Sequence, residues 1–502
     1  MIRFERIGIA ASRFLARFSA MALLACVTAG PISAASAPAS PTASAAASAA
    51  STATTSSAAA APATTSSTAS APSTGAADSK VDPEVHGYVQ TRFRGRHGLG
   101  LGGNEYLYQY VSLQVGDESQ DVSGELFFRG TETVDKQRPP GDPLRGMDDT
   151  FGDPFGRLYY GHVDIKNLGF VDKLRIGRQT IQDVPGIYFD GLRVEDEVDS
   201  RTHYSVYAGN TVHLYEPAQD GDWVLGFDAE HSATDRLKLR LDLARVRDRF
   251  SPFGLPIPRQ TPGRVEADTM AALAAFYDLN SHVDLDAKAL RIDDRFRSVS
   301  MRGNFRYPGD RLYFTLSAER QPSAFFGQAT EFSPMFDVLG SYNGYTQLSL
   351  SGSKGLFEGE LDLNFGYTNR NSDSGAGAPI FNQDFDRWYA GLFLPEVLGN
   401  PKVSLAINYD RYLAQTSEFS TIGGEMGYAF NRQLKFAAGS SYSLYQFDPL
   451  TGLLRDNVRE YYLTCDWKSP ERDWGVRSRL VAEPFQDGGQ FRTLELSVKH
   501  DF

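Results

Sequence analysis

From about residue 85 to the C-terminus, apolar and polar residues alternate with a period of two along most of the chain. The segment 236–243 shows this clearly, because leucines at 237, 239, 241 and 243 alternate with charged residues at 236, 238, 240 and 242. Successive side chains of a β-strand point to opposite faces, so each such segment has one apolar and one hydrated face. The alternation therefore predicts an all-β fold.

Two further features favour a transmembrane barrel over a soluble antiparallel sheet, which shows the same alternation. The segments extend over about 9–13 residues, as a tilted strand that crosses a bilayer requires. Aromatic residues stand near segment ends, where amphipathic rings suit the two lipid–water interfaces. They are Tyr106/Tyr108/Tyr110, Tyr159/Tyr160, Trp388/Tyr389 and Tyr461/Tyr462.

The C-terminus supplies a third feature, because Leu494, Leu496, Val498 and Phe502 share the apolar face of the last segment. A final strand that ends in Phe resembles the assembly signal of Gram-negative outer-membrane barrels, although His500 departs from the apolar pattern of that signal. The resemblance implies a multi-pass β-barrel in the cell outer membrane of a Gram-negative bacterium. It also implies two partners, the outer-membrane lipid and the barrel-assembly machinery.

The alternation and the turn residues predict an up-and-down antiparallel barrel of 22 strands, an even number, as a bacterial barrel with both ends in the periplasm requires. The strands are expected at 85–96, 105–115, 121–131, 156–166, 172–180, 187–195, 202–209, 223–231, 236–246, 267–278, 282–292, 296–305, 311–319, 341–352, 356–369, 382–394, 402–414, 419–430, 433–446, 458–468, 473–482 and 490–501. Three of them, at 172–180, 187–195 and 202–209, are weak, so any count from about 16 to 22 fits the sequence.

The connections support the larger count, because the long ones all fall on one side of the barrel and short turns on the other. The long connections are 132–155, 210–222, 247–266, 320–340 and 370–381. No plug domain is predicted. Wide barrels are usually plugged, so we expect inward-folded connections, or another polypeptide, to narrow the lumen.

The N-terminal region differs sharply from the barrel. Residues 1–34 combine arginines, an apolar stretch and small residues before a cleavage point, the pattern of a secretory signal peptide. Leu23–Cys26 also resembles a lipobox, which would lipidate Cys26, but the apolar run before it is short. Residues 35–80 are almost entirely Ala, Ser, Thr and Pro, so we expect a disordered tether before a barrel at 81–502.

Composition excludes several classes of function. The chain has 2 cysteines, which rules out a disulfide scaffold or a thiolate metal cluster, and it has no CxxCH motif for covalent haem. Its net charge of -12 without a basic stripe disfavours nucleic-acid binding. None of the 8 histidines forms an HExxH motif or accompanies a nucleophile motif, so we expect no enzyme activity, no cofactor and no metal site. The acidic stretch 146–153 is interpreted as a solvated loop rather than a Ca²⁺ site.

The hydrated face carries ladders of like charge, which we expect to line the lumen. The basic positions are Arg92, Arg94, Arg96, Lys173, Arg175, Lys238 and Arg240, and the acidic positions are Glu358, Glu360 and Asp362. Charged rings in a pore select solutes by sign. The simpler interpretation is that opposite ladders pair across strands and keep the lumen hydrated, with inward residues of 490–501 closing beside 85–96.

A second resemblance concerns 174–179 and 189–193, which look like a strand–turn–strand pattern of alginate-export-type porins. The matching positions are Arg175, Gly177, Arg178, Gln179 and Asp190. This resemblance implies a route for a polyanion or a sugar, lined by arginines. The acidity of the barrel does not favour a pore selective only for polyanions.

Three functions follow for such a barrel. The first is a porin or channel that gives hydrophilic solutes a path across the outer membrane, without covalent chemistry. The second is a sheath, because a wide unplugged barrel resembles the barrel component of porin–cytochrome electron conduits, whose partner is a separate multihaem cytochrome. The N-terminal CxxC that some of those barrels carry is missing here. The third is polysaccharide export.

Overall fold

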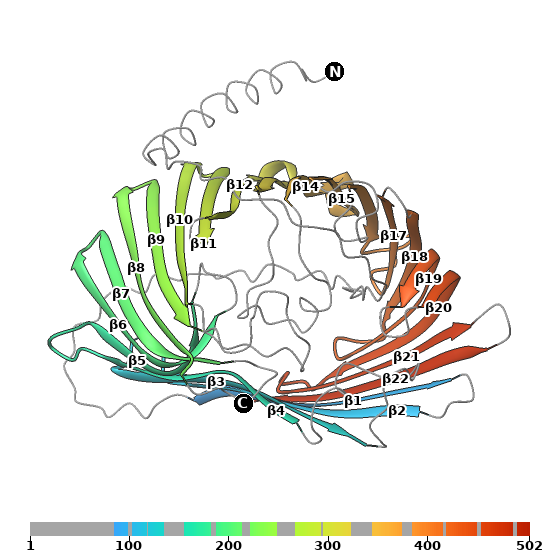
Figure 1. Ribbon diagram of the computed structural model, residues 1–502. Coiled ribbons are helices and arrows are strands. Elements are labelled where there is room, and N and C mark those ends of the chain that lie inside the picture. The colour runs from blue at the N-terminus through green and yellow to red at the C-terminus, as the bar shows by residue number, and fades with distance from the viewer. Residues whose placement is uncertain are drawn as a thin grey trace, which may run out of the picture. The chain divides into compact units, whose positions relative to one another are not determined.

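The structure is a computed structural model (Figure 1). It describes residues 85–98, 103–117, 119–134, 155–181, 187–212, 221–247, 267–292, 295–322, 344–373, 384–414, 418–448, 453–484 and 489–502. The expected signal peptide, lipobox, tether, acidic loop and most of the long connections lie outside these residues. No helix in the described part is long and apolar enough to cross a membrane.

The described residues form 22 strands. They are β1 (Val85–Gly98), β2 (Gly103–Val115), β3 (Val122–Thr133), β4 (Phe155–Lys166), β5 (Lys173–Thr180), β6 (Tyr188–Asp199), β7 (Thr202–Val212), β8 (Trp223–Thr234), β9 (Leu237–Arg247), β10 (Ala267–Asn280), β11 (Val283–Ile292), β12 (Arg295–Tyr307), β13 (Leu312–Gln321), β14 (Tyr345–Leu356), β15 (Leu361–Ser372), β16 (Phe385–Leu394), β17 (Val403–Ala414), β18 (Glu418–Ala429), β19 (Leu434–Asp448), β20 (Leu453–Lys468), β21 (Trp474–Pro484) and β22 (Gln490–Asp501).

The strands close into a ring (Figure 1). Each strand pairs antiparallel with its neighbours in sequence, and β22 returns to pair antiparallel with β1, for example at Arg94 and Glu495. A closed barrel leaves no strand edge with unpaired backbone groups, which is the condition for a sheet to stand in lipid. The predicted barrel and its strand number are confirmed, including the three weak segments, which are β5, β6 and β7.

The longest connections, such as those between β3 and β4 and between β9 and β10, all lie at the same end of the barrel. We call the end where β3 joins β4 and β9 joins β10 the long-connection end. The opposite end, where β8 joins β9 and β10 joins β11 through two-residue turns, is the short-turn end. The inward folding expected of the connections 132–155, 247–266 and 320–340 concerns residues outside those that the structure describes.

The pairing register separates an inner from an outer face. On β9, Leu239, Leu241 and Leu243 are 36–41% exposed, whereas the intervening Asp242 is 1% exposed. Side chains crowd together on the concave face of a closed sheet and spread apart on its convex face. The leucines therefore lie on the outer face and the charged residues on the inner face, as the alternation predicted.

Three tyrosines of the inner face lie against glycines of the next strand. Tyr207 stands opposite Gly226, Tyr389 opposite Gly366 and Tyr462 opposite Gly439. A Cβ atom added to any of these glycines would overlap the facing tyrosine ring. Glycine is needed at these positions because the ring occupies the space of a side chain, an arrangement that also fastens the two strands.

The prediction that aromatic side chains near strand ends face the lipid interface is wrong for several residues. Tyr106, Tyr108 and Tyr110 do not face the lipid interface: they lie on the inner face, where Tyr106 and Tyr108 are 4% and 5% exposed and the Arg129 guanidinium lies 4.8 Å from the Tyr108 ring centroid. Trp388 and Tyr461 do lie on the outer face.

The strand expected over 356–369 begins only at Leu361, because the 3-10 turn η3 (Phe357–Gly359) precedes it. Phe357 and Glu358 have φ values of 50° and 56° there, and the Arg311 guanidinium donates a hydrogen bond to the Glu358 carbonyl. The strand end that the alternation suggested is therefore a turn.

Candidate functional site

The inner face of the barrel gathers most of the residues that the sequence predicted to line a lumen. Arg92, Arg94 and Arg96 lie on β1, Lys173 and Arg175 on β5, Lys238 and Arg240 on β9, and Asp362 on β15, all in inward register. The predicted acidic ladder is wrong for two of its members. Glu358 and Glu360 belong to the turn before β15, not to a strand, so only Asp362 of the three lies on the inner wall.

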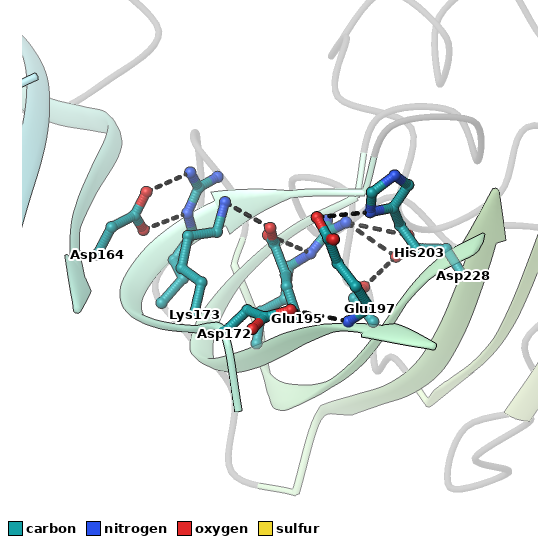
Figure 2. Close-up of polar contacts among 10 residues, drawn as sticks. Asp164, Asp172, Lys173, Glu195, Glu197, His203 and Asp228 are labelled. Atoms are coloured by element: carbon teal, nitrogen blue, oxygen red, sulfur yellow. Dashed lines mark hydrogen bonds and ion pairs between the residues drawn. The ribbon is translucent and has the colours of Figure 1, made fainter. Parts of the chain in front are cut away.

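One part of the inner face, across β4 to β8, carries two neighbouring sets of ion pairs (Figure 2). We call it the ion-pair wall; it consists of Asp164, Lys173, Arg175, Arg193, Glu195 and Asp228. The Arg175 guanidinium makes two hydrogen bonds of 2.7 Å to Asp164. Lys173 pairs with Glu195, and Arg193 joins Glu195 at 3.1 Å to Asp228 at 3.0 Å. The Ser205 hydroxyl of β7 also donates a hydrogen bond to Asp228.

The ion-pair wall presents little net charge to a solute. Its three cationic side chains face three carboxylates, and the side chains of Arg193 and Asp228 are only 10% and 13% exposed. A half-satisfied network of buried charges costs stability, whereas a satisfied one holds its strands in a single arrangement. We therefore assign this wall to the support of β4–β8. Sequence reasoning missed Arg193 and Asp228, although the alternation within 187–195 and 223–231 places both on the hydrated face.

The junction of β22, β1 and β21 differs from that wall because two of its arginines share one acidic partner. Arg92 and Arg94 both approach Glu495, at 3.0 Å and 3.7 Å, and Arg96 lies 3.6 Å from Glu483. Arg94 remains 45% exposed. Two cations on one carboxylate leave a positive excess in contact with water at this place, which can attract an anionic solute.

A third part of the inner face carries hydroxyl groups. We call it the hydroxyl wall; it consists of Thr315, Ser317, Ser349, Ser351 and Thr368. Cross-strand pairs place Thr315 opposite Ser351, Ser317 opposite Ser349, and Ser349 opposite Thr368. Uncharged donors and acceptors in such a patch can exchange hydrogen bonds with water and with polar solutes at little cost.

Stacked arginines border the hydroxyl wall. The Arg370 guanidinium lies 4.0 Å from the Tyr345 ring centroid and 5.3 Å from that of Phe385. On the next strand, Arg387 pairs with Asp410 at 2.6 Å. Flat arginines held by aromatic rings keep their charge and their outer edge available for hydrogen bonds.

A hollow of about 390 Å³ opens on the inner face near the short-turn end. Lys238, Arg240, Glu230, Phe276 and Asp278 are among the residues that line it. Lys238 pairs with Glu230 at 2.8 Å across β8 and β9. This hollow combines charges of both signs with an aromatic side chain, and it places the predicted Lys238 and Arg240 in one site.

No group of three or more His, Cys, Asp and Glu side chains in the described residues could hold a metal ion. Cys465 lies between Leu463 and Trp467 in register with the outer face.

The positions that resemble alginate-export-type porins do not share one face. Arg175, Gly177 and Gln179 are in inward register on β5. Arg178 and Asp190 lie on the outer face and form an ion pair with each other at 2.8 Å. The expected arginine lining therefore loses Arg178, and this motif does not describe a route through the lumen.

The C-terminal residue is joined to the first strand. The Gly87 N–H donates to the Phe502 carbonyl at 2.9 Å, and the Phe502 N–H donates to the Gly87 carbonyl at 3.0 Å. Leu494, Leu496 and Val498 share the outer face with Phe502. Their role as an assembly signal stays a prediction.

Comparisons with known proteins concern the fold alone. No family model matches the chain, and no curated protein does. Among solved structures, the chain is similar to a BenF-like porin from Pseudomonas fluorescens Pf-5, with 10% identity and a TM-score of 0.43 over 84% of this chain and 98% of that one. It is also similar to the translocation pore of the P pilus usher PapC (8% identity, TM-score 0.47, 83% and 99% covered). A third similar structure is OccK1 (OpdK) from Pseudomonas aeruginosa (14% identity, TM-score 0.41, 84% and 98% covered).

Proposed function

We propose that the protein is an outer-membrane channel that lets hydrophilic solutes cross the lipid. The observation that supports this is a closed ring of 22 strands with leucines exposed on its outer face and charges and hydroxyls on its inner face. An apolar band around a polar interior is the arrangement by which antiparallel barrels stand in outer membranes and conduct solutes.

Different parts of the lumen wall have different roles in such a channel. The ion-pair wall is neutralised internally, so it acts as support. The excess of Arg92 and Arg94 over Glu495 attracts anions, and the hydroxyl wall exchanges hydrogen bonds with the passing solute. We infer small polar or anionic organic solutes as the cargo, moved without any covalent step.

Conductance in planar bilayers tests this proposal. The purified full chain should give stepwise ionic currents, and liposomes that contain it should swell in isotonic solutions of small neutral sugars. Folding of the sample is checked by its heat-modifiable migration in gels. A folded barrel that gives neither currents nor swelling would overturn the channel.

The sheath and the export route remain predictions without an observation of their own. A sheath would conduct only after its multihaem partner is lost, or would be unstable alone. Haem staining of proteins that co-purify with the tagged barrel from outer membranes tests that partner directly.

A further inference from the structure

Arginines on the outer face of the barrel gather at one end. The register puts on the outer face the following arginines whose side chains the structure describes: Arg178, Arg245, Arg247, Arg291, Arg320, Arg411, Arg459 and Arg492. Each lies in the half of its strand nearer the long-connection end. We call this set the arginine collar.

The outer face at the short-turn end has a different chemistry. It presents the exposed rings of Tyr277, Tyr307, Tyr428, Trp467 and Trp474. On the strands, the one outward-facing cation among described side chains at this end is Lys354. Aromatic rings suit an interface with weakly charged headgroups, whereas arginines suit an anionic one. The two ends therefore face two different leaflet surfaces.

The centre of the collar is a pair of arginines on β9. Arg245 and Arg247 stand on the same face two residues apart, with Leu225 and Trp223 opposite them on β8. Arg245 is exposed, and both neighbouring strands offer it apolar or hydroxyl side chains, Leu225 and Thr269. Like charges two residues apart on one face of a strand repel each other, and an anion that lies between or above them relieves this repulsion.

Other members of the collar already have acidic partners. Arg178 pairs with Asp190 at 2.8 Å, Arg320 with Asp373 at 2.9 Å and Arg411 with Glu418 at 2.7 Å. Arg245 and Arg247 form no ion pair with any carboxylate of the described residues. A lipid-facing arginine is costly at the bilayer centre and nearly neutral at the interface, so this pair belongs at the headgroup level.

We propose that the arginine collar, centred on Arg245 and Arg247, binds the phosphate groups of a phosphorylated glycolipid in the leaflet at the long-connection end. Guanidinium groups form paired hydrogen bonds with phosphate oxygens. The exposed Leu225 lies beside Arg245, and the exposed Leu243 and Leu273 lie farther from the long-connection end on the same face, where acyl chains of that lipid would pack. The proposal rests on the outer-membrane location in the proposed function, not on conduction.

Binding of the full chain to lipid A vesicles tests the collar. The probe is bisphosphorylated lipid A in neutral phosphatidylcholine vesicles, compared with the same vesicles carrying enzymatically dephosphorylated lipid A. Each arginine near an anionic surface strengthens binding about fivefold. The double variant Arg245→Gln/Arg247→Gln should therefore bind lipid A about 30-fold more weakly. Phosphate removal should have a similar effect on the unaltered protein.

Two controls separate the collar from general charge. Lys354→Gln removes one positive charge at the short-turn end and should leave binding unchanged, and Arg411→Gln removes an arginine already paired with Glu418 and should weaken binding less than threefold. Heat-modifiable migration confirms that each variant is folded. Equal binding by the double variant and the unaltered protein, or equal binding of phosphorylated and dephosphorylated lipid, would overturn the proposal. Conductance of the double variant should be unchanged, so failure of the channel and failure of the lipid site are separate results.

Discussion

The ion-pair wall and the hydroxyl wall line the same lumen, but the first consists of paired charges and the second of uncharged hydroxyl groups. In the ion-pair wall, opposite charges pair with each other and expose little of their surface to solvent, as at Arg193, whose side chain is 10% exposed. The second carries hydroxyl groups and has charged neighbours that remain open, such as Arg387 at 48% exposure. Buried ion pairs resist rearrangement, whereas hydroxyls exchange partners freely. The contrast suggests that a wide barrel assigns stability and solute contact to different strands.

The largest effect expected from this contrast is on stability. Arg193→Ala removes the side chain that joins Glu195 to Asp228. It leaves the poorly exposed Asp228 carboxylate without its cationic partner, while Glu195 keeps Lys173. We expect a loss of about 3 kcal/mol in the free energy of unfolding. Arg387→Ala breaks the exposed pair with Asp410 and should cost less than about 1 kcal/mol.

Urea unfolding in liposomes, followed by tryptophan fluorescence, measures both variants. Equal losses for the two substitutions would show that the walls do not differ in their contribution to stability. A smaller loss for Arg193→Ala than for Arg387→Ala would reverse the assignment.

The glycines that face inner tyrosines allow a second comparison between a buried and a half-buried position, with a smaller expected effect on stability. Gly226→Ala forces a Cβ into the ring of Tyr207, which is 1% exposed and has no free space to enter, so we expect a cost of about 2 kcal/mol. Gly366→Ala meets Tyr389 in the same way, but that ring is only half-buried and can swing into the lumen. Its cost should stay below about 1 kcal/mol. The same unfolding assay compares them, and a larger loss at Gly366 would contradict this reasoning.

Ion selectivity tests whether the hydroxyl wall, and not the ion-pair wall, contacts the passing solute. Ser351→Lys adds a cation to the hydroxyl wall. A unit charge about 10 Å from a passing ion contributes about 0.4 kcal/mol in water, favourable for an anion and unfavourable for a cation, so the anion-to-cation permeability ratio should rise roughly fourfold. The double variant Arg175→Gln/Asp164→Asn removes one charge of each sign from the ion-pair wall and should leave the ratio unchanged. Reversal potentials in a salt gradient give both ratios. A clear shift in the double variant would mean that the ion-pair wall contacts the solute.

The sequence predicted the strands well because a membrane barrel imposes one requirement on all of them. Every strand needs an apolar and a hydrated face, so the alternation marks even the short β5 and settles which side chains point inward. The sequence did not predict the turn η3 because its apolar and charged residues continue the alternation, and because the positive φ values begin at Phe357 and Glu358, before the glycine at 359.

The candidate site was less predictable than the fold. Tyr106, Tyr108 and Tyr110 were misplaced because an amphipathic ring suits a lipid interface and a hydrated lumen equally well. Ion pairs were missed because they depend on the offset between strands. Arg193 of β6 reaches Asp228 of β8 across β7, and only the register and the curvature of the sheet bring these two side chains together.

Carboxylates in the turns of the short-turn end differ from those of the ion-pair wall. They are exposed to water, and their main partners are nearby hydroxyl and N–H groups. Asp473, between β20 and β21, accepts hydrogen bonds from the Ser469 hydroxyl and from the Trp474 N–H. The Ser469 hydroxyl is the main cause that holds the pKa of Asp473 below its usual value. The turn is therefore stabilised while Asp473 is ionised, above the ordinary aspartate range, and it loses this stabilisation as the pH falls through the lowered pKa.

Ser469→Ala tests this smallest effect. We expect the pKa of Asp473 to rise toward the usual aspartate value, while the barrel keeps its unfolding free energy at neutral pH almost unchanged, since the Asp473 carboxylate lies in an exposed turn. The carboxyl carbon shift of Asp473, followed by nuclear magnetic resonance from pH 2 to 6 in detergent micelles, gives the midpoint directly. Ser119→Ala should act in the same direction on Asp117, whose carboxylate accepts the Ser119 hydroxyl in the turn between β2 and β3. An unchanged midpoint in both variants would show that these turn carboxylates are held by the strands beside them, as the buried ones of the ion-pair wall are, and not by their local hydroxyl partners.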